Sequence, residues 1–303
     1  MKQTQVYGLL TLTAFLWGGN AIAVKKVLAE MSPVVLTMLR FAVFSSILMI
    51  AAWFREGKRS IPQRKHLPAL LLMGLSSTVL NNGIQFTGLL YSTAINCVVI
   101  TAFGPVITGV LASLVLNERL NRKQWLGVAI SSAGVIVITS GGSWAKLAGM
   151  YWNWGDILFL LSCVGWSIYA IAGRRIMKEL SPMTTTAWAG GFGSLMMLGI
   201  ALLQGFDGSI SVTGGNWGWL AYICFGSGLV AFTLWNVGVD EVGPNRASVF
   251  INLIPVSGIV FSVLLLGETV GWFHGVGAAW IIGGVWLATR VHPDTPELSE
   301  KVV

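Results

Sequence analysis

The first half of this chain recurs in its second half. Residues 17–33 (WGGNAIAVKKVLAEMSP) and 166–182 (WSIYAIAGRRIMKELSP) align without a gap, 149 residues apart, and agree at seven positions. A second match, 150 residues apart, pairs Pro105 with Pro255, Glu118 with Glu268, Gly127 with Gly277 and Gly134 with Gly284. The unit is much longer than a solenoid repeat of about 20 to 50 residues. In a membrane protein, halves of this length indicate a transporter built from two related bundles around a central site.

The composition places the chain in a membrane. Hydrophobic residues make up 54% of the 303 residues, charged residues only 10%, and the mean hydropathy is +0.74. Soluble domains carry about a quarter charged residues. Because a spanning helix needs roughly 20 mainly apolar residues, we predict an all-α polytopic membrane protein with ten transmembrane helices, at 6–27, 33–54, 67–88, 93–116, 124–141, 155–173, 183–204, 217–238, 246–266 and 272–290.

Five helices per half make the second copy enter the membrane from the opposite side, so the two repeats are expected to be inverted. The predicted domains are a first repeat, a linker loop, a second repeat and a cytoplasmic tail, at 1–141, 142–154, 155–290 and 291–303. Short cytoplasmic loops collect Lys and Arg, and 15 of the 19 basic residues fall on one side if the N-terminus is inside. We therefore predict cytoplasmic N- and C-termini in a bacterial-type inner membrane.

Other classes of protein find little support. The net charge of +7 is explained by the loop bias, so we expect the lipid bilayer and a small-molecule solute as partners and no nucleic acid. The three cysteines are isolated, and no paired metal-ligand spacing, nucleophile elbow or phosphate loop occurs. We expect no catalytic residues, no metal and no cofactor.

Several short motifs carry a resemblance to a known family. They are WGGN in the first helix, LRF in the second, Pro105 followed by NERL, and Pro255 followed by GETV. The pattern resembles the drug/metabolite transporter superfamily, and within it the ten-helix EamA-type branch of metabolite exporters. The resemblance implies a central pocket lined by helices 1, 3, 4, 6, 8 and 9, export of amino acids, aromatic ones among them, and a monomer or weak homodimer.

Polar and aromatic residues within these same helices are the candidate binding residues. Polar side chains inside a bilayer are expensive unless they face the bundle interior or water. The predicted substrate-binding residues are Trp17, Asn20, Ser77, Asn81, Gln85, Asn96, Thr101, Trp166, Tyr169, Trp235 and Asn252. Amides suit the polar groups of a solute, and aromatic walls suit flat apolar groups or a cation. Hydrogen bonding and packing between helices is the alternative for each.

Two prolines and three charged residues have expected structural roles. Pro105 and Pro255 are predicted to bend helices 4 and 9 as hinges. Arg40 is the one basic residue well inside a helix. Binding a solute carboxylate, pairing with a helix-end carbonyl and reaching the interface along its stem are the alternatives, and we favour structure over substrate binding because helix 2 is peripheral in the family. Glu118 and Glu268 are expected to cap the helices that follow them. A Gly271/Gly275 pair is expected to pack helix 10 or to mediate a dimer contact.

The expected function is that of a secondary transporter. No Asp or Glu lies centrally in a predicted helix, and a proton-coupled pump generally needs an ionisable group at membrane depth. We therefore expect facilitative export of small metabolites by alternating access. A multidrug or cation exporter or an importer of the same fold is an alternative, and a membrane scaffold or enzyme without transport is another.

Overall fold

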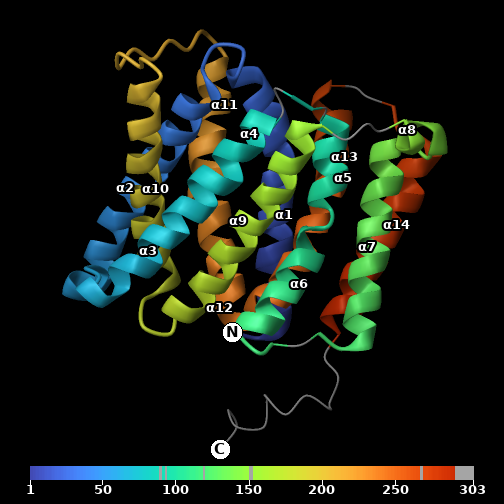
Figure 1. The fold of residues 1–303 in the computed structure, drawn as a ribbon, viewed down its shortest axis with the longest axis horizontal. Coiled ribbons are helices and arrows are strands. Elements are labelled where there is room, and N and C mark those ends of the chain that lie inside the picture. The colour runs from blue at the N-terminus through green and yellow to red at the C-terminus, as the bar shows by residue number, and fades with distance from the viewer. Residues whose placement is uncertain (89–90, 93, 119, 150–152, 267–268, 291–303) are drawn as a thin grey trace, which may run out of the picture.

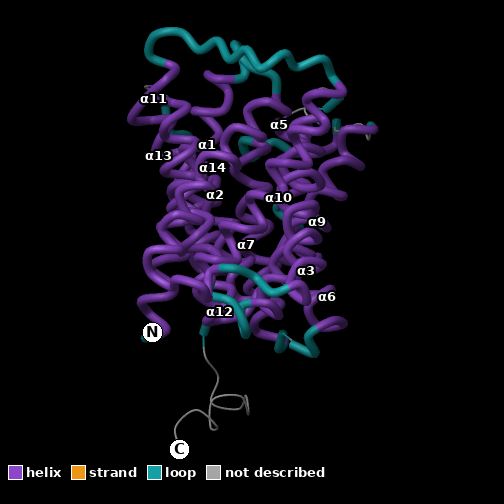
Figure 2. The backbone as a smooth tube through the Cα atoms, turned by 90° about the vertical axis from the view of Figure 1, so that its left-hand side faces the viewer, coloured by secondary structure: helices purple, strands orange, loops and turns teal. Residues whose placement is uncertain are grey.

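Long helices run along the height of the structure, a computed structural model, and short loops join them at both ends (Figures 1 and 2). The structure describes residues 1–290 apart from 89–90, 93, 119, 150–152 and 267–268, and this part contains no strand. Glu268 and the predicted tail at 291–303 lie outside the described residues.

The helical elements follow the predicted order. They are α1 (Gln3–Val27), α2 (Pro33–Glu56), η1 (Gly57–Ser60), η2 (Arg64–His66), α3 (Leu67–Gly74), η3 (Leu75–Gly83), α4 (Ile84–Gly88), α5 (Ala94–Thr101), α6 (Gly104–Val115), α7 (Arg122–Ser140), α8 (Trp144–Ala148), α9 (Trp154–Ile176), α10 (Pro182–Leu203), α11 (Asn216–Ala221), η4 (Tyr222–Val230), α12 (Ala231–Val249), η5 (Phe250–Leu253), α13 (Ile254–Leu266) and α14 (Trp272–Thr289).

Seven helical stretches of the described residues are long and apolar enough to cross a membrane. The last of them, Asn216–Phe261, covers two of the predicted spans, 217–238 and 246–266. Between these spans we expected a loop. In place of a loop of several residues, the single non-helical residue Gly243, with φ of 80° and ψ of 160°, divides the run α12 into two helices, and Pro244 begins the second. Glycine adopts this φ without the clash that a Cβ causes.

We had expected Pro105 and Pro255 to bend continuous helices in their middle, but each proline lies at the beginning of a helix. Pro105 stands in the first turn of α6, and the helical run of α5 has already ended at Thr101. Pro255 is the second residue of α13, directly after the tighter 3₁₀ turn η5. A proline fits a first helical turn because its missing N–H has no partner to lose there. The discontinuity in each helix therefore lies before its proline.

Two π-helical segments interrupt the third and eighth predicted spans. They are η3 and η4, nine residues each, and they contain Ser77 and Ser227, which lie 150 residues apart. The wider π turn changes which backbone groups pair within the helix, and such segments occur often at functional sites. Nothing in the residue pattern had indicated them.

Glycines join α7 to α14, side by side in Figure 1. A Cβ on Gly127 would lie 2.5 Å from the carbonyl oxygen of Gly284, and one on Gly134 would lie 2.7 Å from that of Gly277. The expected Gly271/Gly275 pair does not make this contact. Gly271 precedes the helix as its N-cap, and a Cβ on Gly275 would meet nothing within 4 Å. The glycines at aligned positions of the two halves, such as Gly134 and Gly284, are the ones that pack α7 against α14.

The beginning of α1 and the end of α14 lie at the same end of the bundle (Figure 1). The Tyr7 hydroxyl donates a hydrogen bond of 2.8 Å to the backbone carbonyl of Thr289. An N-terminal residue and a residue near the end of the last described helix are thereby joined directly.

Candidate functional site

Five aromatic side chains from three helices meet inside the bundle. This central aromatic cluster consists of Trp17 from α1, Trp166 and Tyr169 from α9, and Phe232 and Trp235 from α12. The ring centroids of the three tryptophans are 5.3, 5.0 and 5.6 Å apart, so each contacts both others. Trp235 is 1% exposed and Tyr169 2%. These are distances of attractive aromatic contact.

The cluster continues into α2 through Phe232. Its ring lies 5.3 Å from that of Phe41 and 5.5 Å from that of Phe44, both fully buried. Arg40, the neighbour of Phe41, places its guanidinium carbon 5.4 Å from the Phe232 ring centroid, within cation–π range. The first half of the chain thus places a cation beside the aromatic rings of Phe41 and Phe232.

The backbone carbonyl of Ser227 accepts two hydrogen bonds from the first half. The Trp17 indole Nε1 donates at 3.0 Å and Arg40 Nη2 at 3.1 Å. The Ser227 hydroxyl also donates to Asn20 Oδ1 at 2.6 Å. Ser227 lies in the π-helical segment η4, so this segment is held to α1 and α2 by three side chains.

The matching carbonyl in the first half is occupied differently. The carbonyl of Ser77 in η3 accepts a 2.8 Å hydrogen bond from Asn82 Nδ2 of its own helix. The Trp166 indole Nε1, the counterpart of the Trp17 donor, is buried without a hydrogen-bond partner, and so is Trp235 Nε1. Because an unpaired buried donor costs free energy, these two N–H groups are candidates to bind a solute.

A second polar group flanks the cluster. Asn236 Nδ2 donates to the Tyr169 hydroxyl at 2.7 Å and to Thr186 Oγ1 at 2.6 Å, whereas Asn236 Oδ1 has no partner. Asn236 is fully buried. Its free oxygen is an acceptor beside the aromatic rings.

The remaining predicted binding residues are not members of the cluster, and Asn81 and Asn252 contact neighbouring helices. Asn81 Nδ2 donates to the carbonyl of Ser162 at 3.1 Å, Asn252 Nδ2 to Ser131 Oγ at 2.8 Å, and Thr101 Oγ1 to a carbonyl of its own helix at 2.8 Å. Gln85 is half-buried in α4. The Asn81 and Asn252 contacts are of the helix-joining kind that we had weighed as the alternative.

Asn96 belongs to a separate polar group at the start of α9. Its Nδ2 donates to both oxygens of the Asp156 carboxylate, at 3.0 and 3.2 Å, and the Ser92 hydroxyl donates to the same carboxylate at 2.5 Å. Asp156 is 2% exposed and accepts from the backbone N–H of Asn153 in a capping box. This carboxylate is held in place by hydrogen bonds, so it serves to start α9.

Glu118 does not cap the helix after it, contrary to our expectation. Asn121 and Gln124 form the capping box of α7. The Glu118 carboxylate instead lies 3.5 Å from Arg174 Nε, and its backbone carbonyl accepts from Asn245 Nδ2 at 2.8 Å. These contacts join the two halves of the chain at the end where the N-terminus lies.

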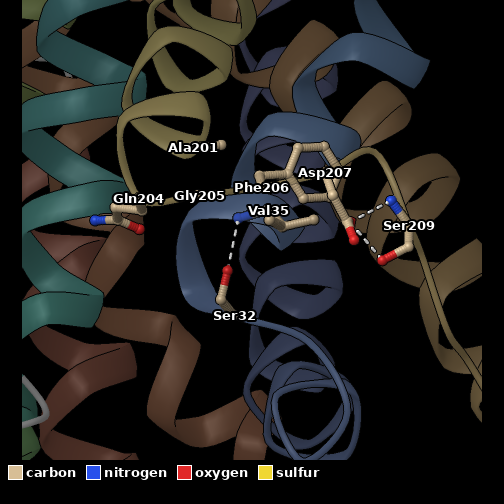
Figure 3. A pocket seen from close by; sticks show the side chains of 8 residues that line it. All are labelled: Ser32, Val35, Ala201, Gln204, Gly205, Phe206, Asp207 and Ser209. Atoms are coloured by element: carbon tan, nitrogen blue, oxygen red, sulfur yellow. Dashed lines mark hydrogen bonds between the residues drawn. The ribbon is translucent and has the colours of Figure 1, made fainter.

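Two surface hollows are lined by none of the predicted binding residues. One is formed by Ala129, Ile130, Ala133 and Trp280 between α7 and α14. The other lies where α10 ends beside the start of α2 (Figure 3), and its lining residues are Ser32, Val35, Ala201, Gln204, Gly205, Phe206, Asp207 and Ser209. There the Asp207 carboxylate accepts from the Ser209 backbone N–H and hydroxyl. Aromatic rings contact one another where we had expected an open pocket.

The sequence reasoning missed Phe232 and the two π-helical segments. A signal for Phe232 existed, because the 150-residue offset aligns it with the polar Asn82. A large apolar residue aligned with an amide indicates a position where the two halves differ in chemistry. Among the described residues, no group of His, Cys, Asp and Glu side chains is arranged to hold a metal ion.

Comparison with known proteins gives a consistent result. The profile of the EamA-like transporter family matches residues 5–140 and 153–290. The uncharacterized transporter YyaM of Bacillus subtilis (strain 168) is 27% identical over 96% of this chain and 95% of its own length. A protein of Salmonella typhimurium (strain LT2) named "Probable amino-acid metabolite efflux pump" is 27% identical over 92% of this chain and 93% of its own.

A solved crystal structure has the same fold, with a TM-score of 0.81 over 95% of this chain and 97% of that chain, at 18% identity. The family match covers both halves of the sequence and nearly all of the described helices. Together with the apolar spanning helices, it shows that the chain is a multi-pass membrane protein and belongs to the EamA-like transporter family.

Proposed function

We propose that this chain is a facilitative exporter of amino acids, aromatic or otherwise apolar, across the inner membrane by alternating access. The observation that carries the proposal is the meeting of Trp17, Trp166 and Trp235 from three helices, with two of the three indole N–H groups unpaired. Rings that contact one another provide flat apolar surfaces for a side chain, and the free donors provide hydrogen bonds for its polar end.

The proposed architecture is two inverted five-helix repeats, 1–141 and 155–290, joined by the linker 142–154, with ten crossings and both termini cytoplasmic. Its support is that residues aligned by the internal match occupy related surroundings. Trp17 and Trp166 contact each other. Gly18 of α1 lies against Ser257 of α13, and its counterpart Ser167 of α9 lies 2.8 Å from Thr108 of α6.

In the proposed mechanism the central aromatic cluster separates so that a solute can replace the ring-to-ring contacts. The breaks before Pro105 and Pro255 are the hinges, because both helices lose regular backbone pairing there. The Glu118–Arg174 contact at the N-terminal end of the bundle would break when that end opens.

The facilitative character rests on where the carboxylates lie. Asp156 is the one Asp or Glu of the described residues that is buried. Its oxygens are occupied by Ser92, Asn96 and the Asn153 N–H. A proton-coupled exporter would need a carboxylate free to change its protonation state near the solute. The amino-acid class is further supported by the name of the Salmonella relative.

Transport by the purified full chain in liposomes tests this proposal. We expect efflux of radiolabelled aromatic amino acids down their gradient, unchanged when a protonophore collapses the proton gradient, and reduced by Trp166→Ala more than by Asn81→Ala. A panel of nucleobases and cationic drugs provides the comparison. Concentrative uptake that vanishes with the proton gradient, or movement of cationic drugs alone, would contradict the proposal.

A further inference from the structure

Arg40 is a buried cation without a counter-ion. Its side chain is 4% exposed, and no carboxylate of the described residues lies within 4.0 Å of its guanidinium. Nη2 donates to the Ser227 carbonyl, and Nε has no hydrogen-bond partner. A guanidinium has five N–H donors. A neutral carbonyl compensates only a part of the cost of burying the charge.

Ring contacts link the residues that carry the unpaired donors. Arg40 lies over the Phe232 ring, which contacts the Trp17 and Trp166 rings at 5.6 and 6.0 Å. Trp17 donates to the same Ser227 carbonyl as Arg40. The indole N–H groups of Trp166 and Trp235 are unpaired as well. A group that satisfies these donors must accept hydrogen bonds and carry negative charge.

We infer that Arg40 binds the carboxylate of the transported solute while the rings of the central aromatic cluster hold its apolar part. This inference rests on the proposed function, which it refines by naming the recognised group. It takes up the alternative that we had ranked below a structural role for Arg40. Guanidinium and carboxylate match each other in two parallel hydrogen bonds. On the other flank, the unpaired Asn236 Oδ1 is an acceptor suited to an ammonium group.

The same arrangement disfavours cationic solutes. The cation–π position over Phe232 is already taken by the Arg40 guanidinium, 5.4 Å from the ring centroid. A second cation there would meet like charge in a medium of low dielectric constant. The residue aligned with Arg40 in the second half is Ala189, so the carboxylate binds on the side of α2.

The test is a binding measurement with matched probes on the purified full chain. Tryptophan fluorescence is titrated with L-phenylalanine, 3-phenylpropionate, L-phenylalaninamide and phenethylamine, and the same four compounds compete with labelled phenylalanine in the liposome assay. We expect the two carboxylates to bind about tenfold to a hundredfold more tightly than the amide and the amine. Arg40→Gln should remove this preference, and Arg40→Lys should retain a part of it.

Arg175→Gln is the matched control, because Arg175 Nη2 also donates to a backbone carbonyl, that of Val115 at 2.6 Å, but at the exposed end of α9. It should leave the carboxylate preference unchanged. A structural role alone would make Arg40→Gln weaken the binding of all probes equally, which would overturn the inference. If Arg40→Gln does not fold, the wild-type preference and Arg40→Lys decide, and equal binding of phenylpropionate and phenylalaninamide to the wild type overturns it.

Failure of the proposed function has a different signature. If the wild type binds carboxylates through Arg40 but moves none of them across liposomes, the transport proposal is wrong and the binding site stands. If it moves solutes without any preference for a carboxylate over a carboxamide, transport stands and the assignment of Arg40 is wrong. No binding and no competition by either carboxylate also contradicts the assignment.

Discussion

The indole rings of Trp17 and Trp166, which the internal sequence match aligns, contact each other edge to face with centroids 5.3 Å apart and an interplanar angle of 80°. Their N–H groups differ. That of Trp17 donates to the Ser227 carbonyl, whereas that of Trp166 is unpaired and the matching Ser77 carbonyl accepts from Asn82. Two copies of one sequence element have thus acquired different roles at their contact.

Replacing each of these tryptophans by phenylalanine should therefore have different consequences. Trp17→Phe removes a made hydrogen bond and leaves a buried carbonyl with one donor fewer, which should cost about 0.5–1.5 kcal/mol of stability. Trp166→Phe removes an unpaired donor, so we expect a smaller loss of stability from hydrogen bonding and a weaker affinity for solute. Thermal unfolding in detergent and the fluorescence titration measure the two effects. Equal losses of stability with unchanged affinity for both variants would speak against a solute-facing Trp166.

The glycines between α7 and α14 should tolerate no side chain. A Cβ on Gly134 would lie 2.7 Å from the Gly277 carbonyl oxygen, so Gly134→Ala must push the helices apart and should cost about 1–3 kcal/mol. Gly275→Ala is the control, because a Cβ there meets nothing within 4 Å. Thermal unfolding should distinguish them. A Gly275→Ala variant as unstable as Gly134→Ala would show that helix contacts differ from those described.

The kink of α12 should depend on Gly243. Its φ of 80° is strained for alanine, and a Cβ would lie 2.7 Å from Glu118 Oε2. We expect Gly243→Ala to cost about 1–3 kcal/mol. Adding Glu118→Ala should restore only a part of the stability, because the backbone strain stays. Gly199→Ala, inside α10 with nothing within 4 Å of the added carbon, is the matched control for thermal unfolding. Complete rescue by Glu118→Ala would mean that the carboxylate clash, not φ, sets the cost.

Two carboxylates outside the spanning helices should make the protein less stable as the pH falls. Hydrogen bonds from Lys65 and His66 lower the pKa of Glu179 from its ordinary 4.5, and hydrogen bonds from Thr213 and Asn216 do the same to the pKa of Glu30. Both groups therefore bind protons more weakly when the protein is folded. Their stabilisation is present above the ordinary pKa and is lost as the pH falls through the lowered value.

The unfolding temperature measured between about pH 3 and pH 7 tests this sign. Glu179→Gln and Glu30→Gln should each lower it near neutral pH and flatten its fall below the ordinary carboxyl pKa. Because Glu179 is exposed and Glu30 only half-buried, salt should weaken the effect. An unfolding temperature that falls with acid as steeply in both variants as in the wild type would assign this loss of stability to other groups.

Much of the fold follows from local sequence. Most predicted spans correspond to a described helix or run of helices, because apolar stretches of spanning length have no other stable form in lipid. The break expected between the spans 217–238 and 246–266 is present, but it is shorter than a loop because one non-helical glycine, Gly243, makes it. The start of α6 was misplaced because a proline alone does not say whether it lies within a helix or at its beginning.

The site was harder to predict, because it depends on which side chains meet. Trp17, Trp166, Tyr169 and Trp235 were named from their positions inside helices, and they lie together. Asn81, Asn96 and Asn252 looked equivalent in the sequence but form contacts between helices. The residue type of an asparagine is the same whether its amide binds a solute or a neighbouring carbonyl. Only the hydrogen-bond partner distinguishes these two roles.

The sequence by itself determined that the chain is helical, apolar and duplicated, because hydropathy, helix length and internal identity can be read from the linear order of residues. The tertiary structure alone decided that the backbone carbonyl of Ser227 accepts hydrogen bonds from Trp17 and Arg40, whereas that of Ser77 accepts one from Asn82. Hydrogen bonds between helices depend on packing distance and on how a π turn presents a carbonyl. Neither quantity is encoded locally, and both follow from the way the two halves pack together.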